Sequence, residues 1–182
     1  MAQLVAFLRA INVGGHTVKM ADLRQLFEAL RFSNVATYIA SGNVIFDAPV
    51  AKASALEAKI ERRLKETLGY EVATFIRSTL DLGTIAAYNP FPSRDRAGEH
   101  SLYVGFTRAA PTDEAQHKLL SFRNDIDDFH VRGREIYWWC RTTVSLSTFT
   151  GARLERAIGM PATMRNISTV RKLAALYADV HS

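Results

Sequence analysis

The chain has 182 residues, of which 48% are hydrophobic and 23% are charged, as in an ordinary globular protein with a buried core. Its formal net charge of +5 favours anionic partners through the overall field but specifies none. No apolar stretch approaches the roughly 20 residues of a membrane-spanning helix, and a single cysteine excludes an internal disulfide bond.

The first half of the chain predicts the element order β-α-β-β-α-β. Residues 1–10 form a strand-length apolar run without a basic leader, so we expect no secretory signal. The lack of a membrane-spanning stretch predicts no membrane partner, and the single cysteine fits the reducing cytoplasm. Alternating apolar and polar residues predict strands, and apolar residues three or four positions apart predict helices. The strands are expected at residues 3–9, 34–40, 44–46 and 71–77, and the helices at 20–31 and from a capping box at 54–57 to Gly69.

The second half of the chain repeats this order. A short helix at 79–87 leads to residues 89–99, which are rich in proline, glycine and charge and are the best linker candidate. Strands are then expected at 100–107, 127–131, 135–141 and 162–166, with helices capped by Thr112, by Ser147 or Thr148, and by Ser168.

The predicted fold class is therefore α+β, with tandem ferredoxin-like (βαββαβ) units, antiparallel sheets and helices packed on one face. The predicted domains are an N-terminal unit over residues 1–88, a linker over 89–99, and a C-terminal unit with a terminal helix over 100–182. The two halves show no repeat at the level of residues, so this tandem duplication rests on element order alone.

A polar loop after the first strand is the main candidate site. It contains Asn12, Gly14 and Gly15, and glycine admits positive φ, so successive backbone N–H groups can point into one anion-binding concavity. Arg9 and Lys19 flank the loop and could neutralise a phosphate or carboxylate. The spacing matches neither a dinucleotide-binding fingerprint nor a P-loop. The alternative is a strand-to-helix bend that needs glycine.

Two further polar junctions are candidates for the same role. Ser41 and Asn43 flank Gly42 at a hairpin tip, where they suit either ligand binding or ordinary turn chemistry. In a ferredoxin-like unit the first and third strands are antiparallel neighbours, which brings the glycine loop near this tip. Arg165 and Asn166, before the last helix, indicate a second anion site or a simple cap beside a solvated basic face.

Catalytic and metal chemistry has little support in the sequence. Cys140 lies in an apolar strand with nothing obvious to lower its pKa. The histidines lack metal-ligand spacing, and His16 is either a proton donor in the glycine loop or merely exposed. Asp125, Asp127 and Asp128 could bind a cation, but the closing glutamate of a calcium loop is missing. No metal is expected, and any cofactor or catalysis stays open.

A nucleic-acid-binding module is an alternative hypothesis. Residues 102–106 look like the first-strand motif of RNA-recognition domains. The partner motif should lie near residues 135–141, where Tyr137, Trp138 and Trp139 supply aromatic rings without the required glycines or phenylalanine spacing. RNA binding is therefore possible without being favoured. A structural or partner-binding domain is the third hypothesis.

Several segments taken together resemble one known family. They are residues 7–15, 18–23 and 38–46, the run Asn89-Pro90-Phe91, the pair Arg165-Asn166, and residues 169–173. On these residues the chain is similar, over essentially its whole length, to the bacterial domain-of-unknown-function family 1697. The family's usual ending resembles Thr-Arg-Asn-Trp-Asn-Thr, from which Met164, Ile167 and Ser168 depart. The resemblance implies a tandem ferredoxin-like fold and no established activity, catalytic residue or cofactor.

The main functional hypothesis is a domain that binds a small anionic ligand bearing phosphate or carboxylate at the glycine loop. Whether binding is accompanied by catalysis, and in which oligomeric state, stays open. The expected binding residues are Arg9, Asn12, Gly14, Gly15, Lys19, Ser41, Asn43, Arg165 and Asn166.

Overall fold

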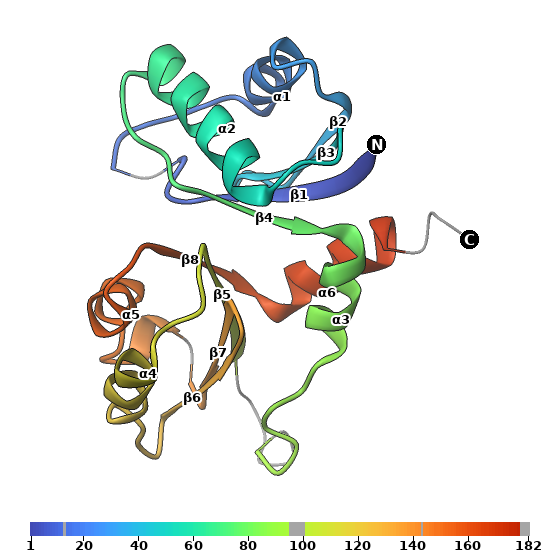
Figure 1. Ribbon diagram of the computed structural model, residues 1–182. Coiled ribbons are helices and arrows are strands. Elements are labelled where there is room, and N and C mark those ends of the chain that lie inside the picture. The colour runs from blue at the N-terminus through green and yellow to red at the C-terminus, as the bar shows by residue number, and fades with distance from the viewer. Residues whose placement is uncertain (13, 95–100, 143, 179–182) are drawn as a thin grey trace. The chain divides into compact units, whose positions relative to one another are not determined.

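The computed structural model describes residues 1–12, 14–94, 101–142 and 144–178 (Figure 1). The backbone contacts divide the chain into two compact units. Unit 1 comprises Met1–Leu82 with the described residues after Leu176, and unit 2 comprises Gly83–Leu176. The predicted division into 1–88, 89–99 and 100–182 stays a prediction, since residues 95–99 and His100 lie outside the described residues.

Unit 1 is built on a four-stranded antiparallel sheet with strand order β2-β3-β1-β4. Each strand and helix of the sequence prediction is confirmed to within a few residues at its ends. The elements are β1 (Ala2–Leu8), α1 (Met20–Ala29), β2 (Ser33–Tyr38), β3 (Asn43–Ala48), α2 (Ala53–Leu68), β4 (Thr74–Ser78) and α3 (Thr79–Ala87), which runs on into unit 2.

Unit 2 contains a second four-stranded antiparallel sheet, with strand order β6-β7-β5-β8. Its elements are β5 (Ser101–Thr107), α4 (Asp113–Leu120), β6 (Asp127–Arg132), β7 (Glu135–Cys140), a 3-10 turn η1 (Val144–Leu146), α5 (Gly151–Ile158), β8 (Ala162–Asn166) and α6 (Ile167–Tyr177). Both sheets have the same relative strand order, so the predicted α+β class with two antiparallel sheets is confirmed.

The core of each unit lies between one face of its sheet and a pair of helices. In unit 1, α1 and α2 cover the same side of the sheet (Figure 1), where Phe27 and Phe32 pack with Phe46. In unit 2, the apolar faces of α4 and α5 join the cluster around Phe129 and Trp138. Alternation along the strands directs these side chains to one face, as the sequence pattern predicts.

The second face of each sheet is buried as well. In unit 1, Phe7 and Phe75 are at most 1% exposed, and Tyr137 of unit 2 is 0% exposed. The Tyr137 hydroxyl donates a hydrogen bond of 3.1 Å to the carbonyl of Ile85, which lies in α3. The prediction of helices on one face therefore describes α1, α2, α4 and α5 but omits the contact of α3 with the second face of the unit 2 sheet.

Glutamates from α2 cap the edge strand of the unit 1 sheet. β4 is an outer strand, so alternate N–H groups point away from the sheet and need other acceptors. Glu61 Oε1 accepts from the Thr74 amide at 2.8 Å, and Glu57 Oε1 accepts from the Ile76 amide at 2.9 Å. Glu57 and Glu61 lie one turn apart on α2, and they reach two amides that lie two residues apart on β4.

Unit 2 repeats one of these caps. Glu155 Oε1, on α5, accepts from the Ala162 amide of the edge strand β8 at 2.9 Å. Ala162 pairs with the last residue of β5, as Thr74 pairs with the last residue of β1. Glu155 and Glu61 therefore hold corresponding places in the two units, a correspondence that the sequence alone did not indicate.

Three predicted helix caps are wrong. The capping box at 54–57 does not form, because α2 begins at Ala53 with Lys52 as its N-cap and Glu57 contacts β4 instead. α5 is capped by Thr150 rather than by Ser147 or Thr148. Ser168 lies inside the first turn of α6, where its own amide donates to Asn166 Oδ1. The Thr112 cap at the start of α4 forms as predicted, and so does the Gly69 cap at the end of α2.

Removing the Glu57 carboxylate should destabilise the protein. Glu57 is 1% exposed, so Glu57→Ala leaves the Ile76 N–H without that acceptor, at a cost of about 1–3 kcal/mol in the free energy of unfolding. Glu57→Gln retains a side-chain carbonyl and should cost less. Urea unfolding measures both against Glu66→Ala, an exposed position on the same helix where a change within ~0.5 kcal/mol is expected. Equal losses for Glu57→Ala and Glu66→Ala would contradict the capping role.

Candidate functional site

The β1–α1 loop is fastened to the β2–β3 turn by the side chain of Asn12. Its Nδ2 donates to the Ala40 carbonyl at 2.9 Å, and its Oδ1 accepts from the Val18 amide at 2.7 Å. The predicted approach of these two connections is confirmed. Asn12 uses both ends of its amide on the chain itself, so it positions the loop.

Gly42 allows the turn to lie against the end of β1. The Leu8 amide donates to the Gly42 carbonyl at 2.8 Å. With φ at +81°, Gly42 adopts a left-handed conformation, and a Cβ there would lie 2.7 Å from Ile11 Cγ2 and 3.0 Å from Leu8 Cβ. Any other residue would both strain the backbone and collide with the loop.

Asn43 belongs to the turn rather than to an accessible surface. It is 0% exposed, and its Nδ2 donates to the Tyr38 carbonyl and to Ser41 Oγ, each at 2.9 Å. Asn43 therefore shapes the turn from inside, while Ser41 lies at its exposed tip.

The remaining predicted residues of unit 1 are exposed around the fastened loop. Gly14 and Gly15 have φ values of +65° and +85°, with no heavy atom within 4 Å of where a Cβ would lie. Arg9 and Lys19 are exposed at the two ends of the loop. His16 stacks on Tyr70 with ring centroids 3.9 Å apart, and the Tyr70 hydroxyl donates to the Ile11 carbonyl at 3.1 Å. The loop is thus held on two sides.

Arg165 and Asn166 belong to unit 2 and are engaged locally. Arg165 is 7% exposed, and its Nη1 donates to Thr163 Oγ1 and to the Met164 carbonyl. Burial lowers the pKa of the Arg165 guanidinium to about 10. Asn166 Oδ1 accepts from the Ser168 amide at 2.9 Å, so Asn166 acts as a cap at the start of α6, which is one of the two predicted alternatives for this junction. Arg165 is buried and therefore does not belong to a solvated basic face.

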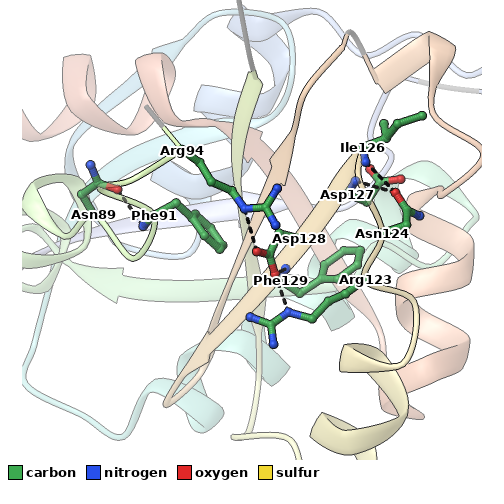
Figure 2. A network of polar contacts seen from close by, with 9 residues as sticks. All are labelled: Asn89, Phe91, Arg94, Arg123, Asn124, Ile126, Asp127, Asp128 and Phe129. Atoms are coloured by element: carbon green, nitrogen blue, oxygen red, sulfur yellow. Dashed lines mark hydrogen bonds and ion pairs between the residues drawn. The ribbon is translucent and has the colours of Figure 1, made fainter. Parts of the chain in front are cut away.

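Unit 2 also contains a polar cluster that the sequence did not reveal. The carboxylate of Asp128 lies between two guanidinium groups, with Oδ2 3.0 Å from Arg94 Nε and Oδ1 bonded to Arg123 Nε (Figure 2). Oδ1 also accepts from the Phe129 amide at 2.8 Å. The Asp128 side chain is 8% exposed, whereas those of Arg94 and Arg123 are 37% and 51% exposed.

A second set of contacts lies on the same face of β6 and β7. Tyr88 Oη lies 2.9 Å from His130 Nε2, and the Arg132 guanidinium lies over the Tyr88 ring at 4.1 Å. The Arg94 guanidinium lies over the Trp139 ring at 4.8 Å. These contacts bind residues 88–94, which include part of the predicted linker, to the sheet of unit 2.

The strand pattern could have revealed part of this cluster. Asp128, His130 and Arg132 alternate along β6, so their sharing of one face follows from the period of a strand. The distant Arg94 and the preceding Arg123 carry no local signal, since neither lies in a strand.

The predicted cation hypothesis for the aspartate run has no geometric support. Asp127 and Asp128 point to opposite faces, and Asp127 accepts hydrogen bonds from Trp138 Nε1 and Ser147 Oγ. Within the described ranges, no three His, Cys, Asp or Glu side chains gather as metal ligands would. Over the same ranges, no helix has the length and apolar character to cross a membrane.

Comparing two glycine substitutions tests the packing of the turn on the loop. Gly42 and Gly69 share a φ of +81°, but only the former has atoms in the way of a Cβ. Both Gly→Ala changes should carry the ~1–2 kcal/mol strain of a left-handed residue, and Gly42→Ala should lose about 1–3 kcal/mol more through overpacking. The urea midpoints of the two variants measure the difference. Equal midpoints would exclude a tight contact at Gly42.

Protonation of His130 should weaken unit 2. Burial, followed by the nearby charges of Arg123 and Arg132, lowers the pKa of His130 against an opposing effect of Asp128. Because the folded pKa lies below the unfolded value of ~6.5, the stabilising contribution is present above about pH 6.5 and is lost as pH falls through the folded pKa. Stability should therefore fall more between pH 7.5 and pH 5 in wild type than in His130→Gln, as measured by urea unfolding. Parallel pH profiles would contradict this.

Comparison with known proteins identifies the family. A family model described as protein of unknown function (DUF1697) matches residues 1–137. Among solved structures, the conserved bacterial protein SP0830 from Streptococcus pneumoniae is similar, with a TM-score of 0.75 and 24% identity over 98% of this chain and 99% of that one. That likeness concerns the fold alone, and no curated protein matches. Since the family model covers most of the sequence, the chain belongs to the DUF1697 family.

Proposed function

We propose that this protein binds a small anionic ligand, bearing a phosphate or carboxylate group, at the β1–α1 loop. The observation that carries the proposal is that Asn12 fastens the loop while its glycines and flanking cations are exposed. A loop held in place before binding loses little conformational entropy when a ligand arrives. The backbone N–H groups of Gly14 and Gly15 and the side chains of Arg9 and Lys19 would contact the anion.

The predicted site residues divide into two roles in this proposal. Asn12 and Asn43 hold the loop and the turn through the bonds described above, so they act as positioning residues. Ser41, exposed at the turn, and His16, stacked on Tyr70, would supply further hydrogen bonds to the ligand. The proposal does not depend on Arg165 and Asn166, which belong to unit 2 and have local partners.

We also propose that both units are ferredoxin-like and that the protein acts in the cytoplasm. The first proposal is supported by the βαββαβ order and by the strand orders β2-β3-β1-β4 and β6-β7-β5-β8. The second is supported by the single, buried Cys140, which fits a reducing compartment. The RNA-binding alternative has less support, because Tyr137, Trp138 and Trp139 are at most 2% exposed and offer no ring for stacking bases.

A thermal-shift assay with a matched charge control tests the anion site. Inorganic phosphate, pyrophosphate, adenosine monophosphate and citrate are titrated at constant ionic strength against wild type and Arg9→Ala/Lys19→Ala. At least one of these anions should raise the melting temperature of wild type, since a ligand at 100 times its Kd stabilises by about 2.7 kcal/mol. The double variant should respond less.

The control variant is Arg62→Ala/Lys52→Ala. Lys52 and Lys19 are both helix N-caps with extended backbone and no side-chain capping bond, and Arg62 is exposed on α2. The control removes the same charge from the same unit. If the anion were attracted only by the net charge, the shift in melting temperature would decrease equally in both double variants. The same response in both, or no response of wild type to any anion, would refute the loop site.

A further inference from the structure

We propose that Arg94 and Arg123 of unit 2 form a second anion site, which takes a phosphate group and is organised by Asp128. This inference is independent of the loop site in unit 1, since it rests on different residues in a separately described unit. Its starting point is the contact in which one carboxylate orients two guanidinium groups (Figure 2).

The way in which Asp128 is shared leaves donors available. An arginine that pairs with a carboxylate alone commonly uses two parallel N–H bonds. Here each arginine reaches the carboxylate through Nε, on a separate oxygen. Within the described residues, the Nη atoms of Arg94 and Arg123 make no hydrogen bond, and Figure 2 shows those of Arg123 pointing away from Asp128. Each guanidinium thus retains four N–H groups for a ligand.

The charges of the three groups favour an anion. Two guanidinium groups meet one carboxylate, which leaves one positive charge in excess. Asp128 is nearly buried and is held by the Phe129 amide, so its negative charge lies beneath the arginines. The side chains of Arg94 and Arg123 are 37% and 51% exposed, so a ligand in solution can reach them.

The side chains are also held in place before a ligand binds. Arg94 lies on the ring of Trp139, and its chain segment is anchored by Phe91, which is 5% exposed. Arg123 precedes the turn in which Asn124 Oδ1 accepts from the amides of Ile126 and Asp127 (Figure 2). Two pre-oriented arginines lose less rotamer entropy on binding than flexible surface side chains do.

A phosphate group fits these donors better than a carboxylate does. Its three or four tetrahedral oxygens can accept from two guanidinium groups at once, whereas a planar carboxylate matches a single guanidinium fork. The site has no further enclosure among the contacts described, so it would recognise the phosphate group itself rather than the molecule that carries it.

Binding to the intact protein tests the proposal, in the Arg9→Ala/Lys19→Ala background so that the loop site does not contribute. Inorganic phosphate is titrated at constant ionic strength into ¹⁵N-labelled protein, and the arginine Nε–H resonances are followed by NMR. The resonances of Arg94 and Arg123, assigned from Arg94→Lys and Arg123→Lys, should shift along one saturable curve. Those of Arg153 and Arg156, on α5, should not.

Affinity measurements on variants complete the test. Arg94→Gln/Arg123→Gln should weaken phosphate binding at least tenfold, whereas Arg156→Gln/Arg171→Gln, which removes the same charge from exposed helix positions of unit 2, should weaken it less than twofold. If Arg94→Gln/Arg123→Gln fails to fold, the arginine resonance shifts of the Arg9→Ala/Lys19→Ala protein still show whether phosphate binds at Arg94 and Arg123. Linear, unsaturated shifts, or equal shifts at all four arginines, would overturn the site. Succinate bound as tightly as phosphate would overturn the assignment of the phosphate group.

Discussion

The constraint on which this structure depends is that backbone N–H and C=O groups removed from water need partners. Within each sheet the strands satisfy one another, but edges, turns and helix ends do not, and side chains from other elements complete them. Glu57 and Glu61 serve β4, Glu155 serves β8, and Asn12 holds the β1–α1 loop by bonding both a donor and an acceptor of the backbone. Each bond fixes an element's position as well as satisfying a polar group.

The same constraint separates scaffold residues from candidate ligand contacts. Three of the predicted site residues are asparagines, and Asn12, Asn43 and Asn166 all direct their amides at neighbouring backbone or turn atoms. The amide of a loop asparagine can form hydrogen bonds to a ligand or to the nearby backbone of a turn. The presence of an asparagine in the sequence therefore does not show which of the two roles it has. The glycines of the loop and the cations at its two ends are exposed, and the proposed chemistry therefore rests on them.

What the sequence could predict follows from the range of the interactions involved. Strands, helices and the turn at Gly42 depend on periodicity and local conformation, and they form where expected. Caps were predicted poorly because several residues near each helix start can serve: Lys52 precedes α2 without a capping bond, and Glu57 has a better use at the edge of β4. The contact of Arg94 with Asp128 joins residues far apart in the chain, and no local pattern encodes such a pairing.

The two units share a scaffold but not the contacts on which the two proposed anion sites rest. Glu61 and Glu155 cap corresponding strands, and the sheets have the same strand order, so the shared features are those that complete the backbone. The connections differ. β1 is followed by a glycine loop held by Asn12, whereas β5 leads to α4 through a short segment with Pro111 and the capping Thr112. The arginine cluster of unit 2 instead lies on the opposite side of β6 from the packed helices. Loops and sheet faces can change without loss of the caps, so a common frame can carry two different anion sites of the kind proposed.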